Sequence, residues 1–315
     1  MQLSRNRPAW NRGSLSPRGS AVAIGNFDGL HRGHAALVAA CLERAGGALD
    51  VAVVTFEPLP QAWFRPERAP SRLTTVYQKL DVLRSLGVDL AWLMRFDSAL
   101  AGLSAREFAE QVLRDGLSAR QVVVGEDFRF GRGREGDVKL LRELGPGLGF
   151  EVASVAAVMC DGQRISSSGI RALLAEGDFA TAARWLGRPF RMEGHVVRGA
   201  RLGRSLGYPT ANLRIRARPS PVAGVLAAFA RTADGPWLPA VTNLGRRPAV
   251  GGTEPLLEVH FFDFDRDLYG QRLEVQFVAK LRDELNFRRI EDLVEQMQRD
   301  EQAARTILAS AASPA

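Results

Sequence analysis

The sequence is poor in the residues that build covalent or metal-based frameworks. Of its 315 residues only two are cysteines, Cys41 and Cys160, and they lie far apart rather than in a CxxC pair. We therefore expect neither a disulfide scaffold nor a zinc cluster, and a reducing compartment such as the cytoplasm fits. No apolar run reaches transmembrane length, so no membrane-spanning helix and no membrane partner are expected.

Charge of one sign is also not gathered on any one predicted helix. The 42 lysines and arginines outnumber the 35 acidic residues, which gives a formal net charge of +7, but the arginines are scattered rather than gathered on one predicted helix. A modest positive excess suits acidic small molecules such as nucleotides, and it is also compatible with weak nucleic-acid affinity. Because the basic residues form no continuous patch, we predict nucleotide ligands and no nucleic-acid partner.

The length favours two domains, and 46% hydrophobic residues are enough for sizeable cores. In the first part of the chain, strand patterns alternate with helix patterns, which predicts a parallel, Rossmann-like α/β sheet with right-handed crossovers. Ser104 and Glu107 have the spacing of a capping box at the start of one of these helices. The predicted strands are at 21–24, 51–56, 89–95, 121–126 and 150–155, and the predicted helices at about 31–44, 75–86, 168–176 and 178–186.

The pattern changes in the second part of the chain. Short strand-like segments are separated by Gly/Pro turns, namely GHVV, GVLAAFA, LPAVTNLG, LLEVHFF and RLEVQF. This rhythm predicts a small antiparallel β-barrel, and residues 289–309 have the spacing of a polar amphipathic helix. We therefore predict one domain at 1–186 and a second at 187–315.

A glycine-rich segment, GNFDGLHRGH at residues 25–34, joins the end of a predicted strand to the start of a predicted helix. Free N–H groups at a helix start bind anions, and glycines permit tight turns and a close approach of phosphate. His31 and His34 share one helix face, so both imidazoles can donate to phosphate and stabilise the charge that builds as pyrophosphate leaves an α-phosphorus. The loop residues predicted to bind ATP phosphate are Gly25, Phe27, Asp28 and Gly33.

The plainer interpretation of this loop is a pair of surface histidines. The chain has only four histidines, and two of them in one glycine-rich loop disfavour that interpretation. Zinc is not favoured either, because no third ligand lies nearby in the sequence. A second segment, ISSSGIR at 165–171, would by itself be a serine N-cap followed by a helical arginine. The glycine-rich segment at residues 25–34, called the histidine loop from here on, belongs to the same α/β unit. Paired with this loop, the hydroxyls of ISSSGIR and Arg171 are predicted to hold phosphate.

In the second half, residues 199–212 read GARLGRSLGYPTAN, a basic loop that includes Gly203. Such a loop can fold over a polyphosphate and neutralise its charge. Thr210 and Asn212 are hard oxygen donors two residues apart, and on an extended segment they point to one side. The pair can hold Mg²⁺, with water and ATP oxygens completing the shell. Taken alone, the segment would be only a polar turn.

Residues 257–262, LEVHFF, alternate apolar and polar side chains, which places Glu258 and His260 on one strand face. A carboxylate there can accept the proton of an attacking hydroxyl. The plainer interpretation is the solvent side of a strand. Further along the chain, we expect Arg282, Asp283 and Glu284 to begin a charged loop or helix.

The N-terminal half resembles the FMN adenylyltransferase module of bacterial bifunctional riboflavin kinase/FAD synthetases. The resemblance is carried by IGNFDGLHRGH, TFEPLP, VVVGEDFRFGRGREGD and ISSSGIR. It implies that the two histidines of the first segment bind ATP phosphates and that Asp127 and Phe128 belong to the flavin and nucleotide pocket. It also implies a phosphate-binding end at Ser167 and Arg171. Gly169 departs from the pattern, since many relatives carry a larger residue there, often arginine.

The C-terminal half resembles the riboflavin kinase module of the same family, through GARLGRSLGYPTANL, NLGRRPAVGG, LLEVHFFDFDRDLYGQRLEVQF and LRDELNF. Together the two resemblances cover about residues 21–300. They imply that Thr210 and Asn212 are Mg²⁺ and ATP ligands and that Glu258 is the base that activates the ribityl 5′-hydroxyl. Arg282 is implied to be a flavin-side residue.

The reaction sequence implied is phosphorylation of riboflavin to FMN by ATP, followed by attack of FMN on the α-phosphorus of a second ATP to give FAD and pyrophosphate. ATP is then a co-substrate, FMN and FAD are products, and no obligate protein partner is expected. One alternative is a nucleotidyltransferase for another acceptor, such as phosphopantetheine or a nicotinamide nucleotide, which the second domain disfavours. The other is a flavin sensor with one inactive domain, which Gly169 leaves open for the N-terminal half.

Overall fold

A computed structural model describes residues 1–5, 14–198, 206–215, 219–245 and 256–314 of the chain. It divides into two compact units, which are described separately here: residues 1–70 with 74–167, and residues 71–73 with 168–315. Helices α7 (Ser167–Glu176) and α8 (Phe179–Leu186) fall in the second unit, apart from the first residue of α7. The domain boundary expected between residues 186 and 187 stays a prediction.

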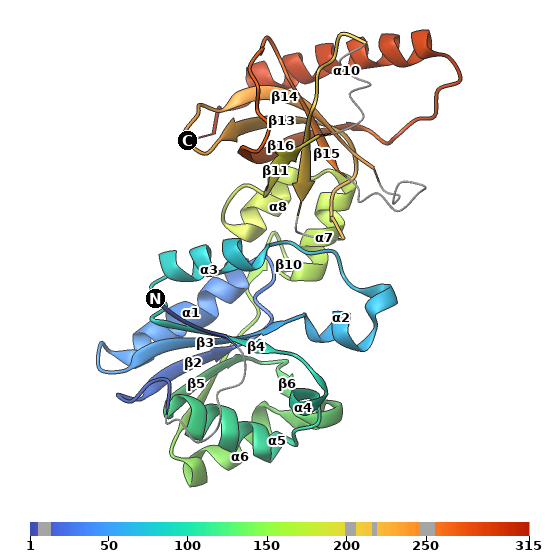
Figure 1. Cartoon of the computed structure of the whole chain (residues 1–315). Coiled ribbons are helices and arrows are strands. Elements are labelled where there is room, and N and C mark those ends of the chain that lie inside the picture. The colour runs from blue at the N-terminus through green and yellow to red at the C-terminus, as the bar shows by residue number, and fades with distance from the viewer. Residues whose placement is uncertain (6–13, 199–205, 216–218, 246–255, 315) are drawn as a thin grey trace. The chain divides into compact units, whose positions relative to one another are not determined.

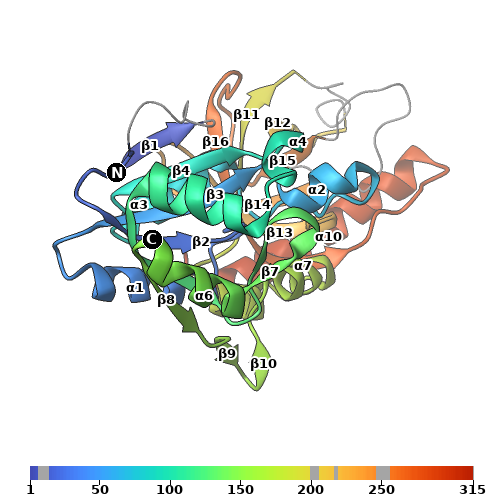
Figure 2. The same ribbon diagram turned by 90° about the horizontal axis from the view of Figure 1, so that it is seen from below.

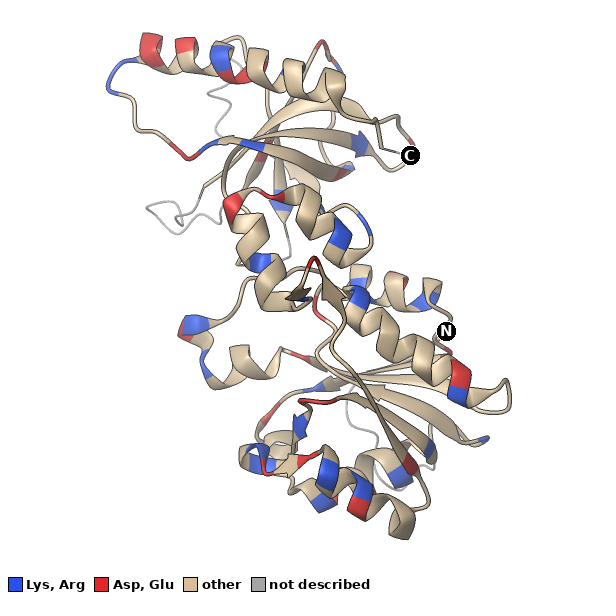
Figure 3. Cartoon of the chain, turned by 180° about the vertical axis from the view of Figure 1, so that it is seen from behind, with Lys and Arg blue, Asp and Glu red and all other residues tan. Residues whose placement is uncertain are grey.

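The first unit is built on a six-stranded sheet in which every neighbouring pair is parallel (Figure 1). The sequence predicted this class because strand patterns alternate with helix patterns. The apolar run AVAI is buried on both faces, as is typical of parallel strands covered by helices. Figure 3 shows the central strands without charged residues except near their ends. In sheet order the strands are β1 (Gln2–Arg5), β4 (Leu90–Arg95), β3 (Asp50–Glu57), β2 (Ser20–Ile24), β5 (Ala119–Gly125) and β8 (Glu151–Val155).

Helices cover both faces of this sheet. On one face α1 (Arg32–Ala45) and α3 (Val76–Ser85) pack their apolar sides over β2, β3 and β5. On the other lie α5 (Ala105–Phe108), its π-helical continuation Ala109–Gly116, and α6 (Val138–Leu148); Figure 2 views the molecule from this side. The predicted capping box is confirmed, since Ser104 and Glu107 exchange both hydrogen bonds at the start of α5.

The remaining elements of the first unit are short and were not predicted. They are the helices α2 (Pro60–Phe64) and α4 (Ser98–Ala101), two 3₁₀ turns (Pro66–Arg68 and Arg132–Arg134), and the hairpins β6 (Arg129–Phe130) with β7 (Gly136–Asp137) and β9 (Met159–Cys160) with β10 (Gln163–Arg164).

The strand order creates a switch point between β2 and β5. From β2 the chain builds towards β3 and β4 on one side, and then crosses to add β5 and β8 on the other. The loops that leave the carboxyl ends of β2 and β5 therefore separate, and this crevice is where open α/β sheets bind their ligands.

The second unit is a closed antiparallel barrel of six strands, as the sequence predicted. The strand β12 was not among the predicted segments, because PTAN has the composition of a turn. The strand β16 extends to Arg282, which corrects the loop or helix expected to start there. In barrel order the strands are β11 (Arg191–Val197), β12 (Ala211–Ile215), β15 (Leu257–Phe261), β14 (Leu238–Leu244), β13 (Gly224–Thr232) and β16 (Arg272–Arg282).

The predicted C-terminal helix is α10 (Ile290–Ser310), which packs against the barrel. Its buried Ala304 and Leu308 join a cluster with Phe229 and Phe262 of the barrel. The charged residues of α10 lie between Glu291 and Arg305, and its last turn is uncharged. Figure 3 shows charged positions along the first part of this helix. Within the described ranges, no helix combines the length and apolarity needed to cross a membrane.

Candidate active sites

The histidine loop of the first unit is closed by the side chains that start α1. His31 is the N-cap, and its Nδ1 accepts a hydrogen bond from the backbone N–H of His34 at 3.3 Å. The two imidazole rings stack with centroids 3.7 Å apart and an interplanar angle of 16°, and His31 is only 7% exposed. The predicted pair is therefore one packed unit at a helix N-terminus, where anions are stabilised.

The backbone of this loop is conformationally unusual. Phe27 has φ 47° and Leu30 has φ 42°, a region that non-glycine residues rarely occupy. Gly33 leaves room for the histidine pair, because a Cβ there would lie 3.1 Å from the His31 ring. Such strain persists only where surrounding contacts hold it, and it is concentrated at functional sites.

A cavity of about 400 Å³ lies beside this loop, at the carboxyl ends of β2, β5 and β8. Seven of the predicted residues line it: Gly25, His31, Gly33, His34, Asp127, Phe128 and, from the ISSSGIR segment, Ser167. The structure thus brings together three segments that are distant in the sequence, at the edge of the sheet where the switch point was found.

Two predicted loop residues lie behind the cavity rather than in its lining. Phe27 is fully buried, and its ring meets the His34 ring with centroids 5.0 Å apart. Asp28 is 3% exposed, its Oδ1 accepts from the Thr74 N–H at 3.3 Å, and its carbonyl accepts from Ser167 Oγ at 2.9 Å. Their side chains support the loop, and contact of either residue with ATP stays a prediction.

Asp127 and Phe128 of the cavity lining have partners of their own, whereas Arg171 lies outside the first unit. Asp127 forms an ion pair with Arg164 at 2.6 Å, with both side chains more than half exposed, and Phe128 stacks on Phe130 with centroids 5.4 Å apart. Arg171 belongs to the second unit, where its Nε donates to the Ser71 carbonyl at 2.5 Å. Its predicted role at the phosphate therefore stays a prediction.

An exposed aromatic group in the first unit was not predicted. Trp63 and Phe64 of α2 each meet Phe96 edge-on, with ring centroids 5.7 Å apart, and Phe64 is 61% exposed. Phe56, near the carboxyl end of β3, packs against the same ring at 5.9 Å. Exposed aromatic faces bind flat ring systems. The only signal in the sequence was the adjacent pair Trp63-Phe64 after TFEPLP.

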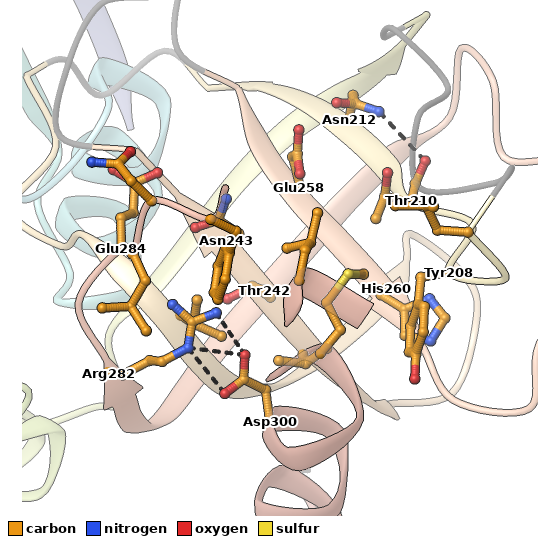
Figure 4. Close-up of a pocket in the computed structure, with 18 residues that line it drawn as sticks. Tyr208, Thr210, Asn212, Thr242, Asn243, Glu258, His260, Arg282, Glu284 and Asp300 are labelled. Carbon is orange, nitrogen blue, oxygen red and sulfur yellow. Dashed lines mark hydrogen bonds and ion pairs between the residues drawn. The ribbon is translucent and has the colours of Figure 1, made fainter. Parts of the chain in front are cut away.

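The second site lies at one end of the barrel, around Glu258. In the register of the sheet, Glu258 is opposite Asn212 of β12 on one side and Asn243 of β14 on the other. These residues line a cavity of about 440 Å³, and Thr210, His260 and Arg282 line it as well (Figure 4). All predicted groups of this half that fall in the described residues thus meet in one cavity, whereas Gly203 lies outside them.

The environment of Glu258 prepares it to accept a proton. Burial raises the pKa of the Glu258 carboxyl above its ordinary value, and the nearby carboxylate of Glu284 raises it further. Glu284 lies over Gly245, where an added Cβ would come within 3.1 Å of its Oε1. A carboxylate with a raised pKa is a better match for a hydroxyl proton than an ordinary glutamate.

The PTAN segment is held against the barrel strand that carries Glu258. His260 Nδ1 lies 2.8 Å from the Pro209 carbonyl, and its ring meets the Tyr208 ring with centroids 5.1 Å apart. Asn212 Nδ2 donates to the Thr210 carbonyl at 3.4 Å, which leaves the amide Oδ1 of Asn212 as a ligand atom (Figure 4). The hydroxyl of Thr210 and this Oδ1 are hard oxygen donors of the kind that Mg²⁺ prefers, so the residues present fit this ion.

Arg282 is fixed by a residue that the sequence did not suggest. Asp300 of α10 is 6% exposed and accepts from Arg282 Nε at 3.0 Å and from Nη2 at 2.7 Å, while Gln296 donates to its Oδ1 at 2.9 Å. Figure 4 shows this fork at the edge of the cavity. Asp300 gave no signal because it lies in an ordinary charged helix, 18 residues from its partner.

Comparisons with known proteins assign both halves of the chain. Residues 14–169 match the family model for FAD synthetase, and residues 186–308 match that for riboflavin kinase. The chain is 42% identical to the bifunctional riboflavin kinase/FMN adenylyltransferase of Escherichia coli K12, over 94% of this chain and 95% of that relative. Relatives with the same description from Pseudomonas fluorescens and Haemophilus influenzae are 43% and 38% identical, over 94% and 98% of this chain and 95% and 100% of theirs.

A solved structure from Streptococcus pneumoniae, described as a macrolide-efflux protein, has the same fold. It matches with a TM-score of 0.82 and 28% identity, over 97% of this chain and 99% of that one. Its description differs from the two family models and the curated relatives, which agree with one another, and the likeness supports the architecture of the chain.

Proposed function

The chain belongs to the family of bifunctional riboflavin kinases/FMN adenylyltransferases, and from this premise we propose which of its residues carry each reaction. Its activities are the ATP-dependent phosphorylation of riboflavin to FMN and the transfer of an adenylyl group from ATP to FMN. The observation that supports the division is that each unit has its own cavity, lined by a different set of groups.

The cavity of the barrel suits the kinase step. We propose that Glu258 takes the proton of the riboflavin 5′-hydroxyl while that oxygen attacks the γ-phosphorus of ATP, so that FMN and ADP form. Thr210 and Asn212 would hold Mg²⁺, which neutralises phosphate charge when bound. Arg282, fixed by Asp300, would contact the flavin side of the substrate.

The cavity of the α/β unit suits adenylyl transfer. A phosphate oxygen of FMN attacks the α-phosphorus of ATP and pyrophosphate leaves, and because that phosphate is already anionic, no strong base is needed. We propose that His31, His34 and the amides of the loop bind the ATP phosphates and stabilise the charge on the leaving pyrophosphate. Phe128, Asp127 and the exposed aromatic group of Trp63, Phe64 and Phe96 are proposed to receive the flavin.

The substrates riboflavin, FMN and ATP are all small molecules. We therefore propose an enzyme that works in the cytoplasm, where MgATP is available, without an obligate protein, nucleic-acid or membrane partner. We propose that the adenylyltransferase domain spans residues 1–186 and that the riboflavin kinase domain spans residues 187–315.

The direct test is to incubate the purified chain with riboflavin and MgATP and to separate the flavins over time. FMN is expected first and FAD later. If neither product formed, the proposed function would be wrong. Accumulation of FMN alone would show that the N-terminal half does not transfer an adenylyl group and is only a flavin-binding domain.

Glu284→Gln is expected to shift the acid limb of the kinase pH profile to lower pH. The Glu284 carboxylate is the second cause that raises the pKa of Glu258, so removing its charge lowers that pKa. Glu258 then becomes deprotonated at a lower pH, and kcat/KM for riboflavin begins to rise earlier as the pH increases. Because Glu284 is exposed, added salt should reduce the difference between the variant and the wild type in the position of the acid limb.

The matched control is Glu295→Gln, which removes a carboxylate paired with Arg299 on α10. An unchanged acid limb in Glu284→Gln would refute the electrostatic coupling between Glu284 and Glu258.

Asp300→Asn is expected to raise KM for riboflavin by about tenfold, the size of a lost charge-assisted hydrogen bond, with a smaller change in kcat. The substitution removes the charge that holds the Arg282 fork in place. Asp263→Asn is the matched control, because it breaks the ion pair of another α10 arginine, Arg305, outside the cavity lining. Equal effects of both variants would show that Asp300 only anchors α10.

A further inference from the structure

A buried lysine lies under the histidine loop and has no part in the reactions as assigned above. Lys79 of α3 is 1% exposed, which is rare because desolvating an ammonium group is costly unless it is well paired. Its Nζ donates to the Asn26 carbonyl at 2.8 Å and to Thr55 Oγ1 at 3.2 Å. The first of these acceptors belongs to the loop itself.

The same carbonyl is held from a second direction. Thr55, a fully buried residue of β3, donates its hydroxyl to the Asn26 carbonyl at 3.0 Å. Lys79, Thr55 and Asn26 therefore form a closed triangle of hydrogen bonds between α3, β3 and the loop. Because the C=O and N–H of a planar trans peptide point in opposite directions, fixing the Asn26 carbonyl towards Lys79 directs the Phe27 N–H away from it.

The start of α3 holds the rest of the loop as well. The Thr74 hydroxyl accepts from the Gly29 N–H at 3.2 Å, and the Thr74 N–H donates to Asp28. These contacts explain how the loop keeps Phe27 and Leu30 at positive φ. Lys79 differs from the other partners, because it also places a formal charge beneath the loop.

A buried positive charge at this position acts on what the loop binds. The field of a charge in a water-poor interior is screened far less than at the surface. It has the same sign as the N-terminal end of the α1 dipole, and both favour an anionic ligand in the cavity. The polyphosphate of ATP and the leaving pyrophosphate are such ligands.

We propose that Lys79 is a positioning residue for adenylyl transfer: it fixes the Asn26 peptide of the histidine loop and favours binding of the ATP polyphosphate there. The proposal rests on the assignment of adenylyl transfer to the first unit. Lys79 acts through the loop and does not touch the reacting atoms.

The test replaces Lys79 by methionine, an apolar side chain of similar length. K79M is expected to raise KM for ATP in the FMN-to-FAD reaction about 10- to 100-fold, as for loss of charge-assisted hydrogen bonds, and to weaken product inhibition by pyrophosphate by a similar factor. Riboflavin phosphorylation by the same sample should be unchanged. K79R keeps the charge and should recover most of the loss. K139M removes an 85% exposed lysine of α6 in the same unit and should behave like the wild type.

The proposal would be overturned if K79M had the KM for ATP and the pyrophosphate inhibition of the wild type. It would also be overturned if adenylyl transfer were as impaired in K79R as in K79M. If K79M lost the thermal transition of the first unit, Thr55→Val would replace it, because it removes one of the two acceptors without removing a charge. A several-fold rise in KM for ATP with unchanged melting would then support the proposal, and an unchanged KM would overturn it. Absence of FAD from the wild type would instead refute the assigned function.

Discussion

Glu258→Gln is expected to lower kcat for riboflavin phosphorylation by about 10²–10⁴-fold, the usual contribution of a general base. Glutamine keeps the shape of the side chain and its place between Asn212 and Asn243, but it cannot accept the proton of the 5′-hydroxyl. FMN supplied directly should still be converted to FAD at the wild-type rate, because that reaction is assigned to the other cavity. The measurement is flavin product formation from riboflavin and, separately, from FMN.

The same preparation thus contains its own control for folding of the first unit. Glu295→Gln adds a control for the loss of one carboxylate from the barrel unit. Near-normal FMN formation in Glu258→Gln would remove Glu258 from the mechanism. Loss of both activities would contradict two independent sites.

His31→Ala is expected to reduce FAD formation from FMN by about 10²–10³-fold, the usual effect of removing one group that stabilises developing charge. It removes an imidazole from the stacked pair and also the N-cap acceptor of α1, which is worth about 1 kcal/mol of stability. Riboflavin phosphorylation should be intact. Both reactions are measured on one sample, with FMN or riboflavin as the substrate.

A second substitution separates the two roles of this histidine. In His31→Asn the side-chain oxygen can still cap α1, but the imidazole is lost, so FAD formation should stay low while thermal stability returns towards that of the wild type. His195→Ala, at an exposed position on β11, is the matched control. Wild-type FAD synthesis in His31→Ala would exclude His31 from the reaction.

Much of the fold was visible in the sequence because burial imposes a period on each element. AVAI and VAVVTF are buried on both faces, which is typical of parallel strands under helices. The short strand segments of the second half are separated by Gly/Pro turns, and this rhythm indicated an antiparallel barrel. The strand β12 was missed because Pro209 and Thr210 look like a turn, although the chain extends directly after them. The cluster of charged residues at Arg282 predicted the start of a loop or helix, whereas pairing with β13 extends β16 to that residue.

The candidate sites were predictable where one short segment carries several chemical groups. The histidine loop and the PTAN segment met this condition, and both line cavities. Lys79, Asp300 and Asn243 did not, because each lies in an unremarkable helix or strand and acquires its place through a partner far away in the chain. Phe27 and Asp28 lie in the histidine loop but turn their side chains behind it, which proximity in sequence cannot reveal.

The sequence by itself determined the two fold classes, the order of the units and the segments that carry the chemistry, because these depend on local periodicity and on groups close together in the chain. Tertiary structure decided which strand ends meet and how β12, β15 and β14 place two asparagines beside Glu258. It also decided that Lys79 holds the histidine loop and that Asp300 holds Arg282. The physical reason is that strand pairing and the pairing of buried ions are contacts between distant residues, and their partners are fixed only when the whole core packs.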